Sequence, residues 1–344
     1  MTVRRLAKLR RVARRLKRRF MPTGLILMYH RVAEVDSDPW SLCVQPRHFA
    51  QHLEVLQKYG WTLPLPQFAQ AHRQGNLPHR AVAVTFDDGY ADNLLNAKPL
   101  LEQHNIPATV FLTSGCIGQS REFWWDDLER ILLQPGTLPQ TLRLNITGNS
   151  HQWDLGEAAR YSKAECQRDR HLKPWDSQPG SRLFFFYSLW QHLYPLPDVE
   201  QQQVLAELIA WAGAQPVARP THRTLSPEEV RALGQGKLVE IGAHTVTHPS
   251  LPAHLVTVQR DEIQQSKAYL EELLNRSVTS FSYPFGDFTP QTAALVRESG
   301  FSCACSTVED VISRQSDSFQ LPRCEVHNWS GEEFEKRLLE WFRG

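Results

Sequence analysis

The chain has 344 residues, 41% of them hydrophobic and 22% charged, which suits one large domain or two ordinary ones and excludes wholesale disorder. No apolar run approaches the roughly 18 residues that a membrane-spanning helix needs. The net charge of +1 conceals a split: residues 1–20 hold ten Lys/Arg and no acid, while the remainder holds 28 Lys/Arg against 37 Asp/Glu. A remainder with a net charge of −9 argues against a general nucleic-acid-binding protein.

The N-terminal segment 1–21 is the most basic part of the chain. Its apolar residues recur at helical spacing: Val3, Leu6, Leu9, Val12, Ala13 and Leu16. The segment is therefore either a solvated tail or an amphipathic helix that lies on an anionic membrane surface. A secretory signal would continue with about 7–15 apolar residues, but Lys17, Arg18 and Arg19 follow instead. We therefore expect a cytoplasmic protein, with peripheral contact to the inner membrane face if residues 1–20 form the helix.

Short apolar runs alternate with helical patterns along the chain. The predicted strands cover 24–30, 80–86, 108–113, 238–243, 278–283 and 301–306. The predicted helices cover 46–59, 91–104, 124–133, 226–234, 255–274 and 289–299. The strand at 81–86 is apolar nearly throughout, which is typical of strands covered on both faces. We therefore predict an α/β fold, with a parallel sheet or barrel flanked by helices.

Residues 135–223 interrupt this alternation. They contain polar, Gln-rich and Pro-rich stretches, an aromatic run at 183–190 and a helical pattern around 198–213. We interpret them as a mainly helical insertion in a loop between a strand and a helix of the domain 22–344. The aromatic run is more typical of the insertion's own small core than of a binding surface.

Two predicted strands end in residues that suit metal chemistry. Asp87 and Asp88 follow strand 81–86, and their mutual repulsion would be relieved by a cation. His244 and His248 follow a later strand, and we expect this spacing to place both imidazoles on one side of a helical turn. Two histidines and one carboxylate leave positions open for water and substrate, as catalytic sites require. Because parallel strands carry their sites at the carboxyl ends, the sequence predicts one metal site there.

These motifs resemble those of a known family. The run Thr85-Phe86-Asp87-Asp88-Gly89-Tyr90, followed later by His244-Thr245-x-x-His248, resembles the polysaccharide deacetylases, carbohydrate esterase family 4. The resemblance covers about 24–133 and 220–328. It implies a distorted (β/α)7 barrel. It also implies hydrolysis of N-acetyl groups on amino sugars with a divalent metal, most commonly Zn²⁺.

The resemblance also assigns roles by position. Asp87 would be the general base, and Asp88, His244 and His248 would be the metal ligands. The metal would lower the pKa of a bound water and polarise the acetyl carbonyl. The backbone N–H of Tyr90 would help to hold the developing oxyanion.

A proton donor is needed as well, because an amide nitrogen leaves poorly as an anion. His327 is one candidate, since Glu325-Val326-His327 approximates the family's final Leu-x-His segment. His30 is the other, because it ends the first predicted strand and should lie on the active face. A hydrogen-bonded structural histidine is the alternative interpretation of His30.

The run 282–286, Ser-Tyr-Pro-Phe-Gly, stands where the family has Arg-x-Pro-x-Gly. The resemblance therefore places Pro284 and Phe285 in the substrate groove. Ser282 occupies the position of the family arginine that orients the base. Arg323, ahead of a strand-like stretch near the C-terminus, is a candidate substitute for it.

Aromatic residues complete the predicted groove. Trp124 and Trp125 either stack on sugar rings or belong to the core. The family's Asp-Trp pair would fall between residues 286 and 320, where this sequence has no Trp. This departure is compatible with the branch that resembles exopolysaccharide-modifying deacetylases.

We therefore predict a metal-dependent hydrolase that removes N-acetyl groups from an N-acetylhexosamine glycan or its lipid-linked precursor. One alternative is a catalytically weakened glycan-binding protein on the same fold. Another is a hydrolase of a different non-peptide carbon–nitrogen bond. No nucleic-acid partner is expected.

Overall fold

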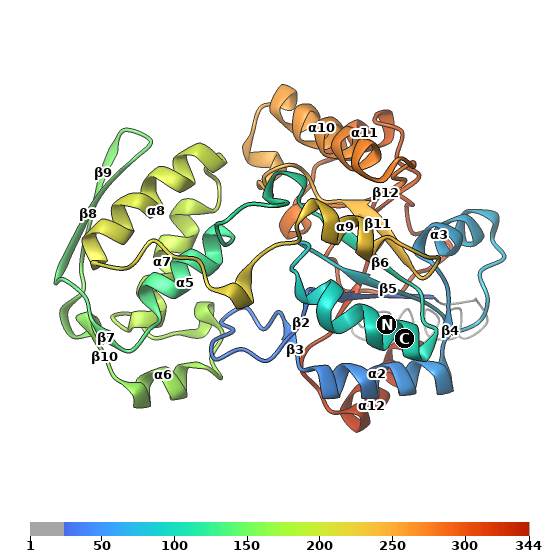
Figure 1. Ribbon diagram of the computed structural model, residues 1–344, viewed down its shortest axis with the longest axis horizontal. Coiled ribbons are helices and arrows are strands. Elements are labelled where there is room, and N and C mark those ends of the chain that lie inside the picture. Colours follow the sequence, from blue (N-terminus) through green and yellow to red (C-terminus); the bar gives the residue numbers. More distant parts are fainter. Residues whose placement is uncertain (1–23, 344) are drawn as a thin grey trace, which may run out of the picture.

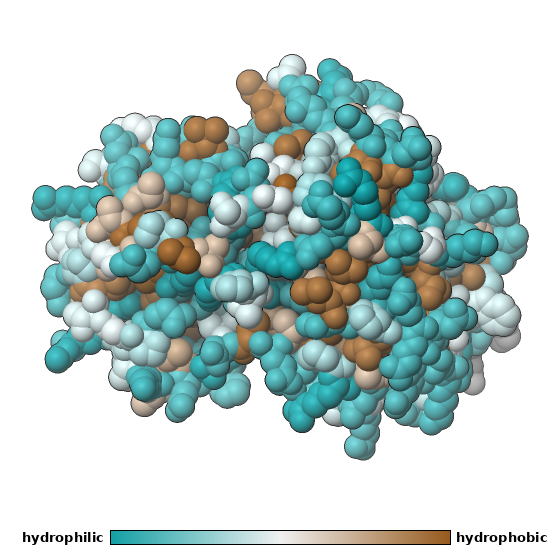
Figure 2. Space-filling model, in the orientation of Figure 1, coloured by the Kyte–Doolittle hydropathy of each residue, from teal (hydrophilic) through white to brown (hydrophobic). Residues whose placement is uncertain are grey.

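The computed structural model describes residues 24–343, so the predictions for segment 1–21 lie outside the described residues. Figure 1 shows two lobes, an α/β lobe that contains the large sheet and a smaller lobe formed by the insertion. Across residues 24–343, none of the helices combines the length and the apolar character needed to cross a bilayer. On the face shown in Figure 2, apolar side chains form scattered groups among hydrophilic ones.

The α/β lobe is built on one parallel sheet. Its principal strands are β1 (Leu25–Tyr29), β5 (Ala81–Phe86), β6 (Ala108–Leu112), β11 (Val239–Ala243), β12 (Ser280–Ser282), β13 (Cys303–Cys305) and β14 (Cys324–Glu325). Their order is β13-β12-β11-β6-β5-β1-β14, and β4 (Trp61–Thr62) adds to β5. Leu321, just before β14, bridges Cys305 of β13, so this segment brings the two edges of the sheet together. The predicted distorted barrel is confirmed.

Every residue of β1, β5 and β6 is buried, which explains why these strands are apolar on both faces. The covering helices are α2 (Pro46–Tyr59), α3 (Leu65–Gln74), α4 (Lys98–His104), α9 (Pro227–Leu233), α10 (Val256–Leu274), α11 (Pro290–Glu298) and α12 (Gly331–Arg343). In Figure 1, α10 and α11 lie on one side of the sheet, and α2 and α12 lie on the opposite side.

The predicted helices of the α/β lobe form close to their predicted bounds. A π-helix, η1 (Asn93–Ala97), precedes α4 within the predicted helix 91–104. At α9, the Ser226 hydroxyl accepts a hydrogen bond from the Glu229 N–H, and the Glu229 carboxylate accepts one from the Ser226 N–H, so both backbone donors at the start of the helix are satisfied. The sequence patterns did not predict α3 and α12.

The insertion lies between β6 and β11. It contains α5 (Trp124–Leu132), α6 (Lys163–Asp169), α7 (Arg182–Leu193) and α8 (Asp198–Ala212). Two antiparallel ribbons accompany the helices: β7 (Gly136–Thr137) with β10 (Arg160–Tyr161), and β8 (Thr141–Ile146) with β9 (Asn149–Asp154). A separate hydrophobic core joins α5, α7 and α8, and Leu128, Phe186, Leu189 and Leu208 are fully buried in it. Helix α5, which lies before residue 135, is therefore part of the same core.

Candidate active site

A cleft opens at the carboxyl ends of the barrel strands. It encloses about 840 Å³ of space, part of it open to solvent. Its polar lining consists of His30, Asp87, Asp88, His244, His248, Thr307 and Glu325. Its aromatic lining consists of Trp40, Trp125, Trp175, Trp190 and Phe285. The cleft therefore combines residues from the barrel with residues from the insertion.

Three buried side chains converge at the floor of the cleft. The Asp88 carboxylate lies 3.5 Å from His244 Nε2 and 3.4 Å from His248 Nε2. Ligand atoms of the three residues all lie within 4.8 Å of one another. His244 Nδ1 lies 2.8 Å from the Ser282 carbonyl oxygen, so a proton on Nδ1 leaves the Nε2 lone pair free toward Asp88. This donor set fits a divalent metal ion such as zinc.

The predicted helical turn between the two histidines is wrong. The chain from His244 to His248 is a loop in which Thr245 and His248 have φ values of 64° and 61°. The loop is held from outside, because Glu262 of α10 accepts hydrogen bonds from the backbone of Val246 and Thr247. The Thr245 hydroxyl accepts a further bond from the His248 N–H. These hydrogen bonds fix the loop so that the two imidazole rings converge. The His-x-x-x-His spacing alone did not predict this loop geometry.

Asp87 lies beside this cluster and is hydrogen-bonded to a buried guanidinium group, that of Arg323. Arg323 donates two hydrogen bonds to the Asp87 carboxylate, of 2.8 and 2.6 Å, and one of 2.9 Å to the Ser282 hydroxyl. Arg323 is completely buried. Burial alone would raise the pKa of Asp87, but the charge and hydrogen bonds of Arg323 outweigh it and lower that pKa. The carboxylate is therefore ionised and fixed in orientation.

The region that contains these residues also matches known proteins. The family model for polysaccharide deacetylases matches residues 74–169 and 197–304, more than half of the chain. The chain belongs to the polysaccharide deacetylase family. The family model spans Asp87, Asp88, His244 and His248, and ends before Arg323.

Individual relatives match over shorter stretches. The Bacillus subtilis protein YxkH is 31% identical over 108 residues, which are 31% of this chain and 37% of that protein. The poly-beta-1,6-N-acetyl-D-glucosamine N-deacetylase of Staphylococcus aureus is 27% identical over 110 residues, 28% of this chain and 38% of the enzyme. The chain therefore spans less than two fifths of the length of these curated relatives.

Solved structures agree in fold. IcaB from Ammonifex degensii has a TM-score of 0.57 over 94% of this chain and 98% of its own, at 19% identity. The Streptococcus pyogenes deacetylase PplD has a TM-score of 0.54 over 93% and 98%, also at 19% identity. These structures share the deformed barrel with this family member.

The two predicted proton donors occupy different places in this deacetylase fold. His30 follows β1 and lines the cleft. His327 is not among the residues that line the cleft. Its Nδ1 lies 3.3 Å from the Ser41 carbonyl oxygen, and its Nε2 lies 3.8 Å from the Glu325 carboxylate. The structure therefore brings His30, and not His327, together with the four residues of the motifs.

Only some of the predicted groove residues line the cleft. Trp125 and Phe285 line the cleft, and both rings pack on His248, at centroid distances of 4.7 and 4.5 Å. Pro284 is buried and does not line the cleft. The Tyr90 ring is fully buried, so its predicted contact with substrate rests on its backbone N–H. Within residues 24–343, no backbone carbonyl accepts a hydrogen bond from that N–H.

Several cleft residues were not predicted. Trp40 comes from the loop between β2 (Arg31–Val32) and β3 (Cys43–Val44), and Trp175 and Trp190 come from the insertion. Nothing in the local pattern shows that these segments lie over the barrel. The signals in the sequence were the large number of Trp residues, ten in all, and, for Trp190, the aromatic run at 183–190.

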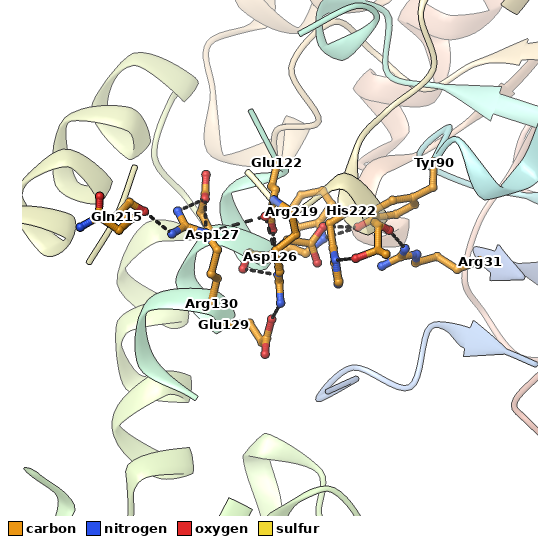
Figure 3. A network of polar contacts seen from close by, with 12 residues as sticks. Arg31, Tyr90, Glu122, Asp126, Asp127, Glu129, Arg130, Gln215, Arg219 and His222 are labelled. Atoms are coloured by element: carbon orange, nitrogen blue, oxygen red, sulfur yellow. Dashed lines mark hydrogen bonds and ion pairs between the residues drawn. The ribbon is translucent and has the colours of Figure 1, made fainter. Parts of the chain in front are cut away.

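A buried polar network joins the cleft wall to the insertion (Figure 3). Trp125 Nε1 donates to the Tyr90 hydroxyl over 3.0 Å, and the Tyr90 hydroxyl donates to Asp126 over 2.7 Å. Arg31 lies over the Tyr90 ring at 4.3 Å, and Arg219 donates to the Asp126 carbonyl oxygen. Burial raises the pKa of the Asp126 carboxyl to about 8, despite the opposing charge of Arg31.

This raised pKa predicts a pH-dependent stability effect. A carboxyl that binds its proton more tightly in the folded state stabilises the fold at low pH, and that contribution disappears as the pH rises toward 8. Asp126→Asn removes the titration but keeps an oxygen that accepts from Tyr90. From pH 5 to pH 8, the unfolding free energy of Asp126→Asn should rise relative to wild type, by up to about 1.4 kcal/mol per pH unit.

Urea unfolding at pH 5, 6.5 and 8 would measure this difference. The matched control is Asp36→Asn, which removes a fully exposed carboxylate. Parallel pH profiles for Asp126→Asn and wild type would contradict the raised pKa.

Proposed function

We propose that the protein is a metal-dependent N-deacetylase of N-acetylhexosamine glycans. The observation that carries this proposal is the juxtaposition of the Asp88–His244–His248 cluster with the Arg323-held carboxylate of Asp87 in one cleft. A protein that only bound glycans would have no need of two adjacent buried carboxylates.

Asp88, His244 and His248 would hold the metal, which we expect to be zinc. When bound, the ion would lower the pKa of a water molecule and polarise the acetyl carbonyl. The donor chemistry supports this assignment, because two imidazole nitrogens and one carboxylate oxygen are the ligands that open, catalytic zinc sites use. All three side chains are buried, so a bound ion would be shielded on the protein side.

The chain's own residues would move the protons. Asp87, kept ionised by Arg323, would accept the proton of the attacking water. The Tyr90 N–H would donate to the oxygen that gains negative charge. His30 would donate a proton to the departing sugar amine, since it is the candidate acid that lines the cleft. Trp125 and Phe285 would pack against the acetylated sugar.

The charge of the cleft favours a neutral substrate. The residues that line it include three carboxylates, Asp87, Asp88 and Glu325, but no Lys or Arg. Apart from the proposed metal ion, a diphosphate group close to the reacting sugar would meet no Lys or Arg side chain among the lining residues. The lining therefore supports a neutral glycan, and the lipid-linked precursor remains a prediction from the sequence.

Acetate release from N-acetylated oligosaccharides tests the proposed function. Zinc-loaded protein should release acetate, and removal of the metal with a chelator should abolish release until zinc is restored. If metal-loaded protein binds these glycans without releasing acetate, the glycan-binding alternative holds instead.

The metal ligands have their own test. The double variant His244→Ala/His248→Ala should lose the bound metal and the activity together, because one carboxylate cannot hold the ion alone. Elemental analysis of the purified protein would measure the metal. The matched control is His151→Ala/His192→Ala, a pair of neighbouring histidines whose ring centroids lie 4.6 Å apart in the insertion. Equal metal content in the two double variants would contradict the assignment.

A further inference from the structure

We propose that the insertion supplies a second sugar-binding subsite, formed by Trp175 beside Trp40, which holds a ring of the glycan beyond the reacting unit. The proposal rests on the proposed function, because it makes the substrate an oligosaccharide or polymer. Both tryptophans line the same cleft as Asp87 and Asp88.

Trp175 differs from the other aromatic residues of the cleft in its exposure. Its surface is 53% exposed, whereas Trp125 is 4% exposed and stacks on Phe123 at a centroid distance of 4.5 Å. Trp125 is therefore committed to the cleft wall. Trp175 retains a large apolar surface that a ligand can cover.

The position of Trp175 is well supported. The ring centroids of Trp175 and Trp40 lie 6.4 Å apart, and the angle between the two ring planes is 29°. The two rings therefore form neighbouring aromatic surfaces. Trp40 is fixed in turn by Trp190 and Phe186, at 4.9 and 5.6 Å. Trp175 itself sits in a short 3-10 turn, Pro174–Asp176, whose first residue is buried. The surface is therefore largely formed before a ligand arrives, which lowers the entropic cost of binding.

The chemistry of the surface fits a pyranose ring. The C–H face of a sugar is apolar and covers an aromatic ring, while its hydroxyl groups remain in water or bind nearby polar groups. The cleft lining carries Glu325 and no Lys or Arg, and Lys173 lies over the Trp175 ring with its Nζ 5.6 Å from the ring centroid, so the surface around Trp175 has charges of both signs, which suits a neutral ligand.

The test compares substrates of different length. Probes are the disaccharide and pentasaccharide of N-acetylglucosamine in β-1,4 and β-1,6 linkage. In the zinc-loaded full chain, Trp175→Ala should lower kcat/KM for the pentasaccharide about tenfold, chiefly by raising KM, with a much smaller effect on the disaccharide. Trp175→Phe should recover most of the loss, because it restores an aromatic face. The matched control is Trp61→Ala, which removes a 62% exposed tryptophan from β4, outside the cleft.

Calorimetric binding of the pentasaccharide to metal-free protein gives an independent readout. Trp175→Ala should weaken this binding about tenfold, and Trp61→Ala should not. If acetate is never released but binding still depends on Trp175, the proposed deacetylase function fails and the subsite stands. If acetate is released and Trp175→Ala affects both chain lengths equally, or binds the pentasaccharide like wild type, the subsite is wrong and the function stands.

Discussion

Replacing Asp87 with Asn should lower kcat/KM for acetate release by about 10²–10⁴-fold, the usual contribution of a general base. The amide keeps the size of the side chain but cannot accept a proton from water. Bound metal should remain, because Asp88, His244 and His248 are unchanged. Elemental analysis and steady-state kinetics on the same preparation would measure both quantities.

This variant also leaves the buried Arg323 without its counter-charge, so a loss of stability must be separated from a loss of chemistry. Asp92→Asn is the matched control, because it removes a buried carboxylate from another arginine pair, with Arg31, outside the cleft lining. Asp92→Asn should lose stability yet retain far more activity than Asp87→Asn. If both variants lost activity equally, or if Asp87→Asn stayed within a few-fold of wild type, Asp87 would be a structural acid.

The strands and helices of the barrel could be predicted because their signals are local. A strand buried on both faces must be apolar throughout, as β5 is. The polar residues that follow such strands lie at one edge of the sheet. The sequence therefore predicted that Asp88 and the two histidines would lie close together, and they do. The geometry of the connecting loop could not be predicted, because it depends on Glu262 from another helix.

The structure of the insertion could not be predicted from the sequence for a different reason. The strand β8 alternates buried and exposed residues, a period-two pattern that the Gln-rich and Pro-rich composition around it obscured. The position of Trp175 over the barrel depends on how the insertion's own core packs, and a sequence pattern carries no information on that. The cleft's aromatic side therefore emerged only from the structure.

The partner of Asp87 in the candidate site was predicted in part: Arg323 was named from the sequence as a candidate substitute for the family arginine, and its hydrogen bonds to Asp87 confirm the pairing. Ser282, at the position of the family arginine, cannot supply a positive charge. Arg323 supplies it from a segment 236 positions along the chain from Asp87, beside the last strand of the barrel. A short motif cannot report such a substitution, because the two residues meet only once the sheet has curled and its edges have joined.

Arg323→Met should therefore destabilise the fold by about 3–5 kcal/mol, since it leaves the buried Asp87 without its counter-charge. Arg323→Lys keeps the charge but loses the two parallel hydrogen bonds, so its cost should be smaller. Urea unfolding at pH 7 would measure both. Arg323→Met should also lower kcat more than it raises KM, because an Asp87 that is no longer held ionised and oriented is a poorer base.

A double-mutant cycle isolates the pair itself. Asp87→Asn/Arg323→Met removes both charges, so its loss of unfolding free energy should be at least about 1 kcal/mol smaller than the sum of the two single losses. Activity should behave similarly: once Asp87 is Asn, Arg323→Met should cost little further rate. Losses that add within about 0.5 kcal/mol would show that the two residues are not coupled. The Ser282 hydroxyl, which also contacts both, would then be the group that positions the base.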